Sequence, residues 1–291
     1  MKSAAPPVLS GIAALVPSYD LILCDVWGVV HNGETAYPGA VEALHRARAA
    51  GCTVILITNA PRPGAVIEQM ISGYAVPRTC FDTIVASGDV ARMELRRWPG
   101  VKLFHLGPER DLPNYEGLDL SLVDFDKAEM VVCTGFFDDN VETPDDYREM
   151  LARIHALGLP FICANPDIVV ERGNRLIWCA GALAQAFERI GGTAIYAGKP
   201  HAPIYDLALA RAAEIRGSAV PREWVLAIGD GVRTDLAGAV RQRFDCIFVA
   251  DGIHAAELKL GEGGLHDMAA AGRMFAEAGA LPAAIIRRLA W

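Results

Sequence analysis

The sequence contains no uninterrupted apolar run of the ~20 residues that a membrane-spanning helix requires. Its first eighteen residues hold one lysine and no continuous apolar segment, so we expect neither a cleaved secretory signal nor a membrane partner. No block of Lys and Arg occurs, and acidic residues outnumber basic ones by 35 to 27. Because a nucleic-acid-binding protein normally has a basic face, we expect no nucleic acid partner. A small phosphorylated ligand stays compatible with this composition, since it needs only a few local cations.

Cysteine pairs with metal-binding spacing are also missing. The seven cysteines are an odd number and include no Cys-x-x-Cys, and several lie inside apolar runs: Cys24, Cys133, Cys163 and Cys246. This pattern favours buried, reduced thiols in a cytoplasmic protein over a disulfide framework or a zinc site.

Hydrophobic residues make up 52% of the 291 residues, which is enough for a sizeable core in one large domain or two modest ones. Short apolar runs alternate with longer helical patterns. The predicted strands are Leu21–Cys24, Thr53–Ile57, Ile84–Ala86, Val101–Leu106, Met130–Cys133, Phe161–Cys163, Ala194–Ala197, Val225–Ile228 and Cys246–Val249. The predicted helices are Gly39–Ala50, Pro63–Ile71, Val90–Trp98, Pro144–Leu157, Ala182–Ile190, Pro203–Arg216 and Asp235–Arg243. Continuous apolar strands alternating with helices indicate an α/β fold with a doubly wound parallel sheet.

The middle of the chain differs in detail from the rest. Residues 89–190 carry strand and helix patterns of their own and an acidic, loop-rich section around Asp119–Lys127. Because α/β segments resume afterwards, we expect an inserted α/β domain over 89–190, with residues 1–88 and 191–291 forming the main domain.

Polar residues follow four of the predicted strands. The four segments are Asp25-Val26-Trp27-Gly28, Thr58-Asn59, Gly198-Lys199-Pro200 and Gly229-Asp230 through Thr234-Asp235. Each segment alone is most often a turn, a helix cap or a loop with an exposed lysine. Together they point to one site, because ligands bind at the carboxyl edge of open parallel sheets.

The residue types in these segments suit phosphoryl transfer. Three carboxylates brought together repel one another unless a hard cation lies among them, and Mg²⁺ prefers oxygen ligands. The Mg²⁺ ion and a lysine can neutralise a phosphoryl group, which leaves one carboxylate to attack phosphorus.

In order and spacing, these four segments resemble the motifs of the haloacid dehalogenase (HAD) superfamily. The closest likeness is to its class IIA capped phosphatases, the NagD-type or p-nitrophenylphosphatase-like group. In that class an α/β cap is inserted between the second and third motifs, and here 139 residues separate Asn59 from Lys199. The segment Ala164-Asn165-Pro166-Asp167 also resembles a loop of that cap. The resemblance covers residues 21–252 and implies a HAD-like core with an inserted cap.

Carried over to this sequence, the resemblance implies that Asp25 is the nucleophile and a Mg²⁺ ligand. The main-chain carbonyl of Trp27 and the carboxylate of Asp230 would be further ligands, and Asp235 would hold metal-bound water or support the lysine. The residues that would bind the phosphoryl group are Thr58, Asn59 and Lys199. The implied activity is a Mg²⁺-dependent phosphatase that acts on a small phosphorylated metabolite, such as a sugar phosphate. The class often dimerises, which implies a homodimer.

One position departs from the family pattern, which is usually Asp-x-Asp-Gly with the second Asp as general acid and base. Here Trp27 takes that place, and indole neither donates nor accepts a proton usefully. General acid–base help is typically worth ~10²–10⁴ in rate, so ordinary sugar-phosphate hydrolysis should be slow. Three hypotheses stay open: His31 relays a proton, the substrate has a good leaving group, or the protein binds phosphate without efficient turnover.

Several other residues are weaker candidates. Substrate contacts in the inserted domain are suggested for Asp167, Arg172 and the pair Phe136-Phe137, and added positive charge for Arg62 and Arg233. Turn, core or solvated surface roles are at least as common for these residue types.

The competing function is a phosphate- and metal-binding regulatory module with little or no turnover. A dehydrogenase lacks its Gly-x-Gly-x-x-Gly fingerprint, and a cofactor-free dehalogenase has no need of Asp230 and Asp235.

Overall fold

The computed structural model describes residues 6–172, 175–258 and 268–291. The chain divides into two compact units. The first unit comprises Met1–Thr58, Glu68–Ile84 and Tyr205–Trp291, and the second comprises Asn59–Ile67 and Val85–Ile204. The limits 89–190 for an inserted domain stay a prediction, since this division places residues 59–67 and residues 191–204 in the second unit as well.

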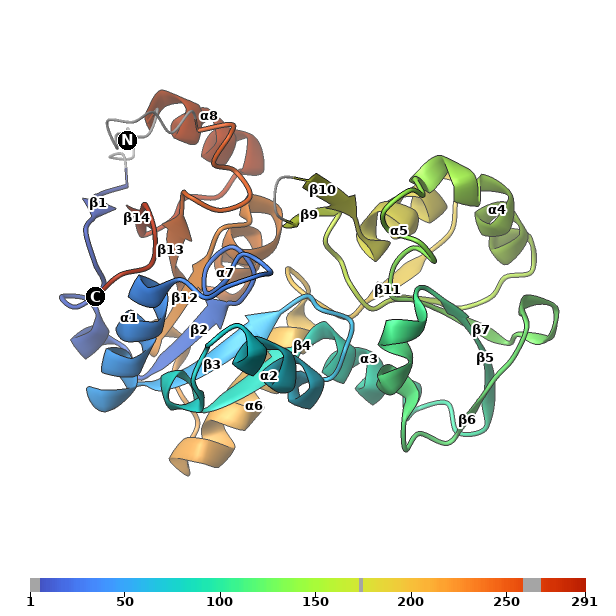
Figure 1. The fold of residues 1–291 in the computed structure, drawn as a ribbon, viewed down its shortest axis with the longest axis horizontal. Coiled ribbons are helices and arrows are strands. Elements are labelled where there is room, and N and C mark those ends of the chain that lie inside the picture. Colours follow the sequence, from blue (N-terminus) through green and yellow to red (C-terminus); the bar gives the residue numbers. More distant parts are fainter. Residues whose placement is uncertain (1–5, 173–174, 259–267) are drawn as a thin grey trace. The chain divides into compact units, whose positions relative to one another are not determined.

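A seven-stranded sheet forms the centre of the first unit in the described part of the chain (Figure 1). Its strand order is β1 (Val8–Leu9), β14 (Ala284–Ile286), β13 (Asp245–Val249), β12 (Val225–Gly229), β2 (Leu21–Asp25), β3 (Thr53–Thr58) and β4 (Thr83–Ala86). The pairs from β1 to β3 are parallel. Every residue of β2, β3 and β12 is buried, which explains why the middle of each strand is apolar.

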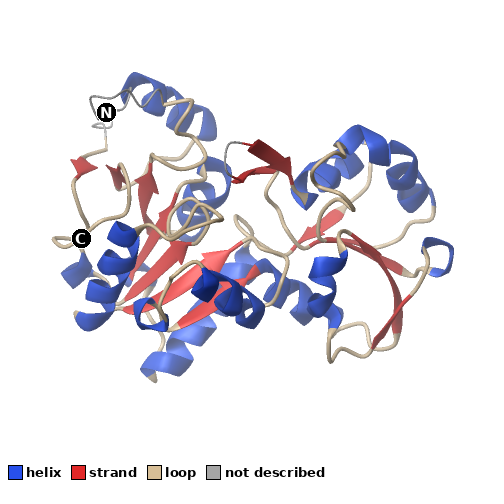
Figure 2. Cartoon of the chain, in the orientation of Figure 1, coloured by secondary structure: helices blue, strands red, loops and turns tan. Residues whose placement is uncertain are grey.

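Helices alternate with the strands along the chain (Figure 2). Their bounds are α1 Pro38–Ala49, α2 Gly64–Gly73, α3 Ser87–Leu95, α4 Arg148–Ala156, α5 Ala180–Arg189, α6 Ala202–Arg216, α7 Ala237–Gln242 and α8 Met268–Ala278. The predicted α/β class with a parallel sheet is therefore confirmed.

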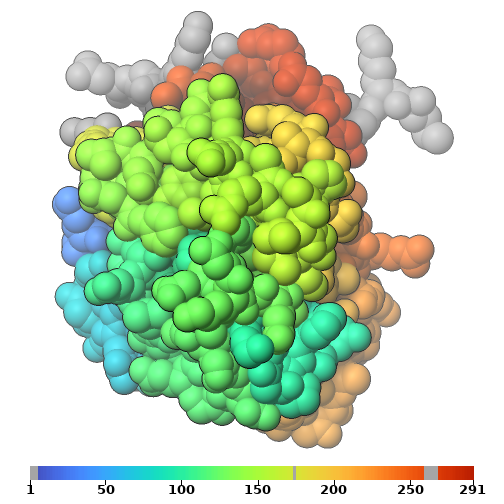
Figure 3. Space-filling view, turned by 90° about the vertical axis from the view of Figure 1, so that its right-hand side faces the viewer, coloured from blue at the N-terminus to red at the C-terminus, as the bar shows by residue number. Residues whose placement is uncertain are grey.

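The second unit is built on a five-stranded parallel sheet and a two-stranded antiparallel hairpin, as far as its described residues show. The sheet order is β11 (Ala194–Tyr196), β8 (Phe161–Cys163), β7 (Met130–Cys133), β5 (Val101–Leu106) and β6 (Leu120–Leu122), and the hairpin pairs β9 (Val169–Arg172) with β10 (Arg175–Trp178). A buried apolar cluster joins this sheet to α4 and α5, with the rings of Phe161 and Phe187 stacked 4.8 Å apart. Residues of this unit form most of the green surface in Figure 3.

Each predicted strand is present, with its ends shifted by at most one residue. The sequence patterns missed β1, β6, β9, β10, β14 and α8, most of which are short or partly exposed. The helix predicted at Val90–Trp98 lies three residues earlier, at Ser87–Leu95. Two predicted helices begin with another helix type: Pro144–Leu157 starts as a 3₁₀ helix at Pro144–Tyr147, and Asp235–Arg243 starts within a π-helical turn at Val232–Leu236.

All seven cysteines are buried, as the sequence predicts for thiols inside apolar strands. Burial raises the pKa of the Cys163 and Cys179 thiols well above the ordinary value. Among the described residues, no helix combines the length and the hydrophobicity that crossing a membrane would require.

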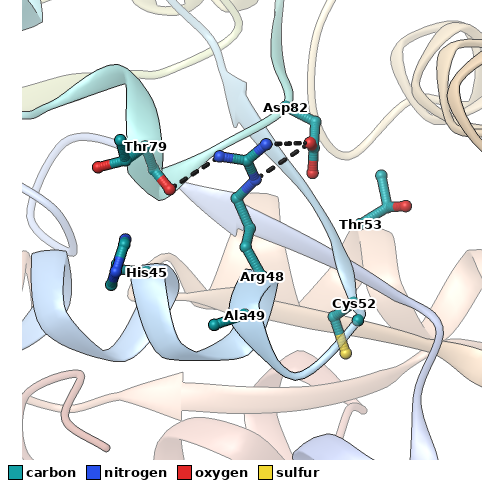
Figure 4. Close-up of a pocket in the computed structure, with 8 residues that line it drawn as sticks. His45, Arg48, Ala49, Cys52, Thr53, Thr79 and Asp82 are labelled. Atoms are coloured by element: carbon teal, nitrogen blue, oxygen red, sulfur yellow. Dashed lines mark hydrogen bonds and ion pairs between the residues drawn. The ribbon is translucent and has the colours of Figure 1, made fainter.

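A pocket of about 460 Å³ lies at the amino edge of the large sheet, where β3 begins (Figure 4). Arg48 of α1 donates to Asp82 Oδ1 from Nε at 3.0 Å and from Nη2 at 2.6 Å, and to the Thr79 carbonyl at 2.8 Å. The other oxygen of Asp82 accepts the Val54 N–H at 2.8 Å. The Asp82 carboxylate, which lies just before β4, thus connects α1 and β3. We therefore interpret the polar residues of this pocket as structural.

We predict that Asp82→Ala lowers the free energy of unfolding by about 1.5–3 kcal/mol, because it removes a charge-assisted partner of Arg48 and of a strand N–H. Urea unfolding measures this loss. Glu223→Ala, at an exposed carboxylate, is the control and should change stability little. Equal losses in the two variants would contradict the assigned role.

Candidate active site

Three neighbouring strands bring polar residues to the carboxyl edge of the large sheet. Strand β2 lies between β12 and β3, and the register pairs Asp25 with Ile57 and Cys24 with Ile228. Asp25 therefore ends β2 beside Thr58 at the end of β3 and next to Gly229 at the end of β12. This edge is where ligands bind in open parallel sheets.

Three carboxylates gather at this edge. Asp25, Asp230 and Asp235 each offer one oxygen, and these oxygens all lie within 4.8 Å of one another. The residues are 6%, 6% and 5% exposed. Three negative charges held this close in a poorly hydrated place repel one another strongly unless a cation lies between them. The all-oxygen donor set suits a hard divalent cation such as Mg²⁺ or Ca²⁺.

Backbone groups fix the two carboxylates that follow β12. Asp230 Oδ2 accepts the Ile253 N–H at 2.8 Å, and Asp235 Oδ2 accepts the Gly231 N–H at 3.1 Å and the Thr234 hydroxyl at 3.3 Å. Gly28 has φ +83°, and a Cβ atom there would lie 2.1 Å from Asp230 Oδ2. Residue 28 must therefore be glycine for the chain after Asp25 to pass so close to Asp230.

Trp27 lies in the turn that directly follows the Asp25 strand. The Gly28 N–H donates to the His31 carbonyl at 2.8 Å, and the Val30 N–H donates to the Val26 carbonyl at 2.8 Å. The metal contact of the Trp27 carbonyl stays a prediction. The half-buried indole of Trp27 meets the ring of His31 edge to face, with ring centroids 5.2 Å apart.

His31 is completely buried. Its Nδ1 accepts the Gly33 N–H at 2.8 Å, and its ring packs 5.0 Å from that of Tyr74. Burial lowers the pKa of His31 to about 4. The proton-relay hypothesis needs an imidazole that gains and loses a proton near neutral pH, and His31 does not meet this requirement. Its predicted part in proton relay therefore has no support from its surroundings.

In the second unit, Asn59 holds the segment that carries Lys199. The Asn59 side-chain amide donates to the Lys199 carbonyl at 3.1 Å and to Asp167 Oδ1 at 2.8 Å, and its oxygen accepts the Lys199 N–H at 2.7 Å. Lys199 itself is 2% exposed. Residues 140 positions apart are thus joined. Asp167 accepts a hydrogen bond from the same amide, and its predicted contact with substrate stays a prediction.

The weaker candidates have varied surroundings. Arg62 forms an ion pair with the buried Asp111 at 3.4 Å, and Arg172 binds the buried Asp139 at 3.0 Å. Burial tends to raise the pKa of Asp139, but the hydrogen bond from Arg172 and the charge of Arg110 lower it overall. The sequence analysis missed Asp139, because no strand end or motif marks it.

The remaining candidates divide by exposure. Phe136 is fully buried in the core of the second unit, whereas Phe137 is 44% exposed. Arg233 is exposed in the π-helical turn. The Ile253 N–H, which fixes Asp230, was also missed, since a backbone donor leaves no trace in residue type.

Comparison with known proteins agrees with this geometry. Residues 22–121 match the haloacid dehalogenase-like hydrolase family, and residues 196–270 match a HAD-hydrolase-like model. The crystal structure of a haloacid dehalogenase-like hydrolase from Brucella suis 1330 is 48% identical, with a TM-score of 0.86 over 97% of this chain and 99% of that one.

Two further relatives are more distant. Ribonucleotide monophosphatase NagD of Escherichia coli (strain K12) is 29% identical over 240 residues, covering 80% of this chain and 88% of that protein. The p-nitrophenyl phosphatase from Archaeoglobus fulgidus is 18% identical and shares the fold, with a TM-score of 0.70 over 93% of this chain and 96% of that one.

The chain therefore belongs to the haloacid dehalogenase-like hydrolases. Within them it is a homologue of NagD, and its fold is that of the capped class IIA members, as the four motifs indicate.

We predict that Mg²⁺ raises the melting temperature of the natural protein and that Asp230→Asn abolishes this rise. A cation that binds only the folded state stabilises it, by about 2.7 kcal/mol at a concentration of 100 Kd. Asp206→Asn, at an exposed residue of α6, is the matched control and should keep the effect. Differential scanning fluorimetry and calorimetric titration measure it, and an unchanged response in Asp230→Asn would argue against the cluster as the metal site.

Proposed function

We propose that this protein is a Mg²⁺-dependent phosphatase that hydrolyses a small phosphorylated metabolite through an aspartyl-phosphate intermediate. The observation that carries the proposal is the buried cluster of Asp25, Asp230 and Asp235 at the carboxyl edge of the sheet. One carboxylate ends a strand while the other two follow β12, which suits a nucleophile at Asp25 and a metal site beside it.

The names of the relatives support a phosphate monoester as substrate. NagD of Escherichia coli is a ribonucleotide monophosphatase, and the protein from Archaeoglobus fulgidus is a p-nitrophenyl phosphatase. Both names describe removal of a phosphoryl group from a small molecule. A sugar phosphate is the substrate class suggested by the motif resemblance.

In the proposed reaction, a carboxylate oxygen of Asp25 attacks phosphorus and the bond to the leaving oxygen breaks. Water then attacks phosphorus, and the bond to Asp25 breaks to release phosphate. Bound Mg²⁺ would offset the negative charge of the phosphoryl oxygens. Asp25, Asp230 and the Trp27 carbonyl would hold it, with Asp235 binding its water or supporting Lys199.

The phosphoryl oxygens need hydrogen-bond donors and a fixed positive charge. We assign these roles to Thr58, which ends β3, and to Asn59 and Lys199. The two hydrogen bonds between the Asn59 side chain and the Lys199 backbone support a role for Asn59 in fixing that backbone. We also propose a cytoplasmic, homodimeric enzyme, in line with its buried thiols and with the class it resembles.

We predict Mg²⁺-dependent hydrolysis of p-nitrophenyl phosphate that Asp25→Asn reduces by at least ~10³-fold, because removing a nucleophile removes the covalent route. Release of p-nitrophenol measures the rate, and Asp206→Asn should retain it. Absence of turnover in the natural protein, with phosphate or vanadate still bound, would favour the regulatory-module hypothesis instead.

We predict that Lys199→Met lowers kcat by about 10²–10³-fold, because a buried cation that stabilises the transition state is lost. It should also raise the inhibition constant for vanadate. Lys127→Met, at an exposed lysine, is the control. Unchanged vanadate inhibition in Lys199→Met would remove this residue from the phosphate site.

A further inference from the structure

We propose that Trp27 makes this enzyme selective for phosphate esters whose leaving group is acidic, such as phenols and enols, over esters of ordinary alcohols. This inference rests on the proposed phosphatase function, and it replaces the sugar phosphate that the motif resemblance suggests with more reactive esters. It depends on where the indole lies and on what surrounds it.

The turn after Asp25 fixes the position of residue 27. Two backbone hydrogen bonds of 2.8 Å close the segment from Val26 to His31 on itself. Residue 27 is thus two positions from the proposed nucleophile, in a turn that leaves little freedom to its backbone. In the motif that this segment resembles, the residue at this position is usually the aspartate that transfers the proton.

The indole of Trp27 is packed into this turn. A Cβ atom at Gly33 would lie 2.6 Å from Cζ2 of Trp27, so the ring occupies the space that a side chain at position 33 would need. The ring of His31 meets it edge to face. An indole has one N–H donor and no acceptor, and it neither releases nor takes up a proton in the physiological range.

His31, whose titratable ring packs against Trp27, is shielded from solvent. It is 0% exposed, and its Nδ1 accepts the Gly33 N–H. Its Nε2 is buried and has no hydrogen-bond partner among the described residues. Because Trp27 and Tyr74 pack against its ring, the imidazole has no open path to a substrate oxygen.

The consequence for the first step follows from the electron balance. As Asp25 bonds to phosphorus, the leaving oxygen takes the electron pair of the broken bond. Without a proton donor at position 27, that oxygen leaves as an anion and is protonated by water afterwards. A phenolate or enolate leaves readily in this way, whereas an alkoxide is far more basic. Hydrolysis of alcohol esters therefore lacks general acid catalysis, which is typically worth ~10²–10⁴ in rate.

The second step lacks the same residue as a base. Water attacks phosphorus, the electron pair of the broken bond returns to Asp25, and the proton of water passes to a phosphoryl oxygen or to solvent. This step is identical for all substrates and slow. Among reactive esters kcat should therefore be uniform, whereas kcat/KM, which reports the first step, should vary steeply with the leaving group.

The experiment uses aryl phosphates that carry phenols of graded acidity, together with an alkyl phosphate, all assayed with Mg²⁺. For the natural protein, log kcat/KM should fall steeply as the pKa of the leaving group rises. A rapid burst of p-nitrophenol should precede the steady state. Trp27→Asp should raise kcat/KM for the alkyl phosphate by about 10²-fold or more, with little gain for p-nitrophenyl phosphate.

The matched control is Trp27→Asn, which has the size of aspartate without its proton chemistry and should keep the steep dependence. Trp224→Asp, at a half-exposed tryptophan, controls for the added charge. If the natural protein hydrolyses alkyl and p-nitrophenyl phosphates equally well, the inference is overturned and the phosphatase function stands. If it hydrolyses no ester at all, the proposed function itself fails. The natural protein alone decides between these outcomes.

Discussion

Mutual repulsion among three buried carboxylates is the constraint on which the proposed chemistry depends. Three features bring these carboxylates together. Asp25 stands at the end of β2, the Ile253 N–H binds Asp230, and the Gly231 N–H binds Asp235. These contacts position the carboxylate oxygens. A divalent cation bound among the oxygens would offset their mutual repulsion.

The second unit shows a different way of arranging a site. Here the Asn59 side chain forms hydrogen bonds with both Asp167 and the Lys199 backbone, so one amide connects segments that are far apart in the sequence. The charge of the buried Lys199 is expensive to remove from water, and holding its backbone restricts where that charge can lie. The motifs containing Asn59 and Lys199 are thus joined by direct hydrogen bonds.

Sequence reasoning succeeded where residue type and burial coincide. The apolar strands fixed the edge at which Asp25, Thr58 and Gly229 meet, and the parallel register places them there. It failed where burial changes the chemistry of a residue. His31 reads as a neutral-pH titrating group in the sequence, yet its pKa is lowered because no water reaches it. Backbone donors such as the Ile253 N–H, and ion pairs such as Arg172 with Asp139, depend on tertiary structure that no local pattern encodes.

The placement of Trp27 has a spectroscopic consequence. Indole emission responds to the charge and polarity around the ring, and this ring is held by a closed turn two residues from Asp25. In the proposed reaction, conversion of that carboxylate to an acyl phosphate would change the local electric field. A change in Trp27 emission, measured over that of the other four tryptophans, would then report the covalent intermediate optically.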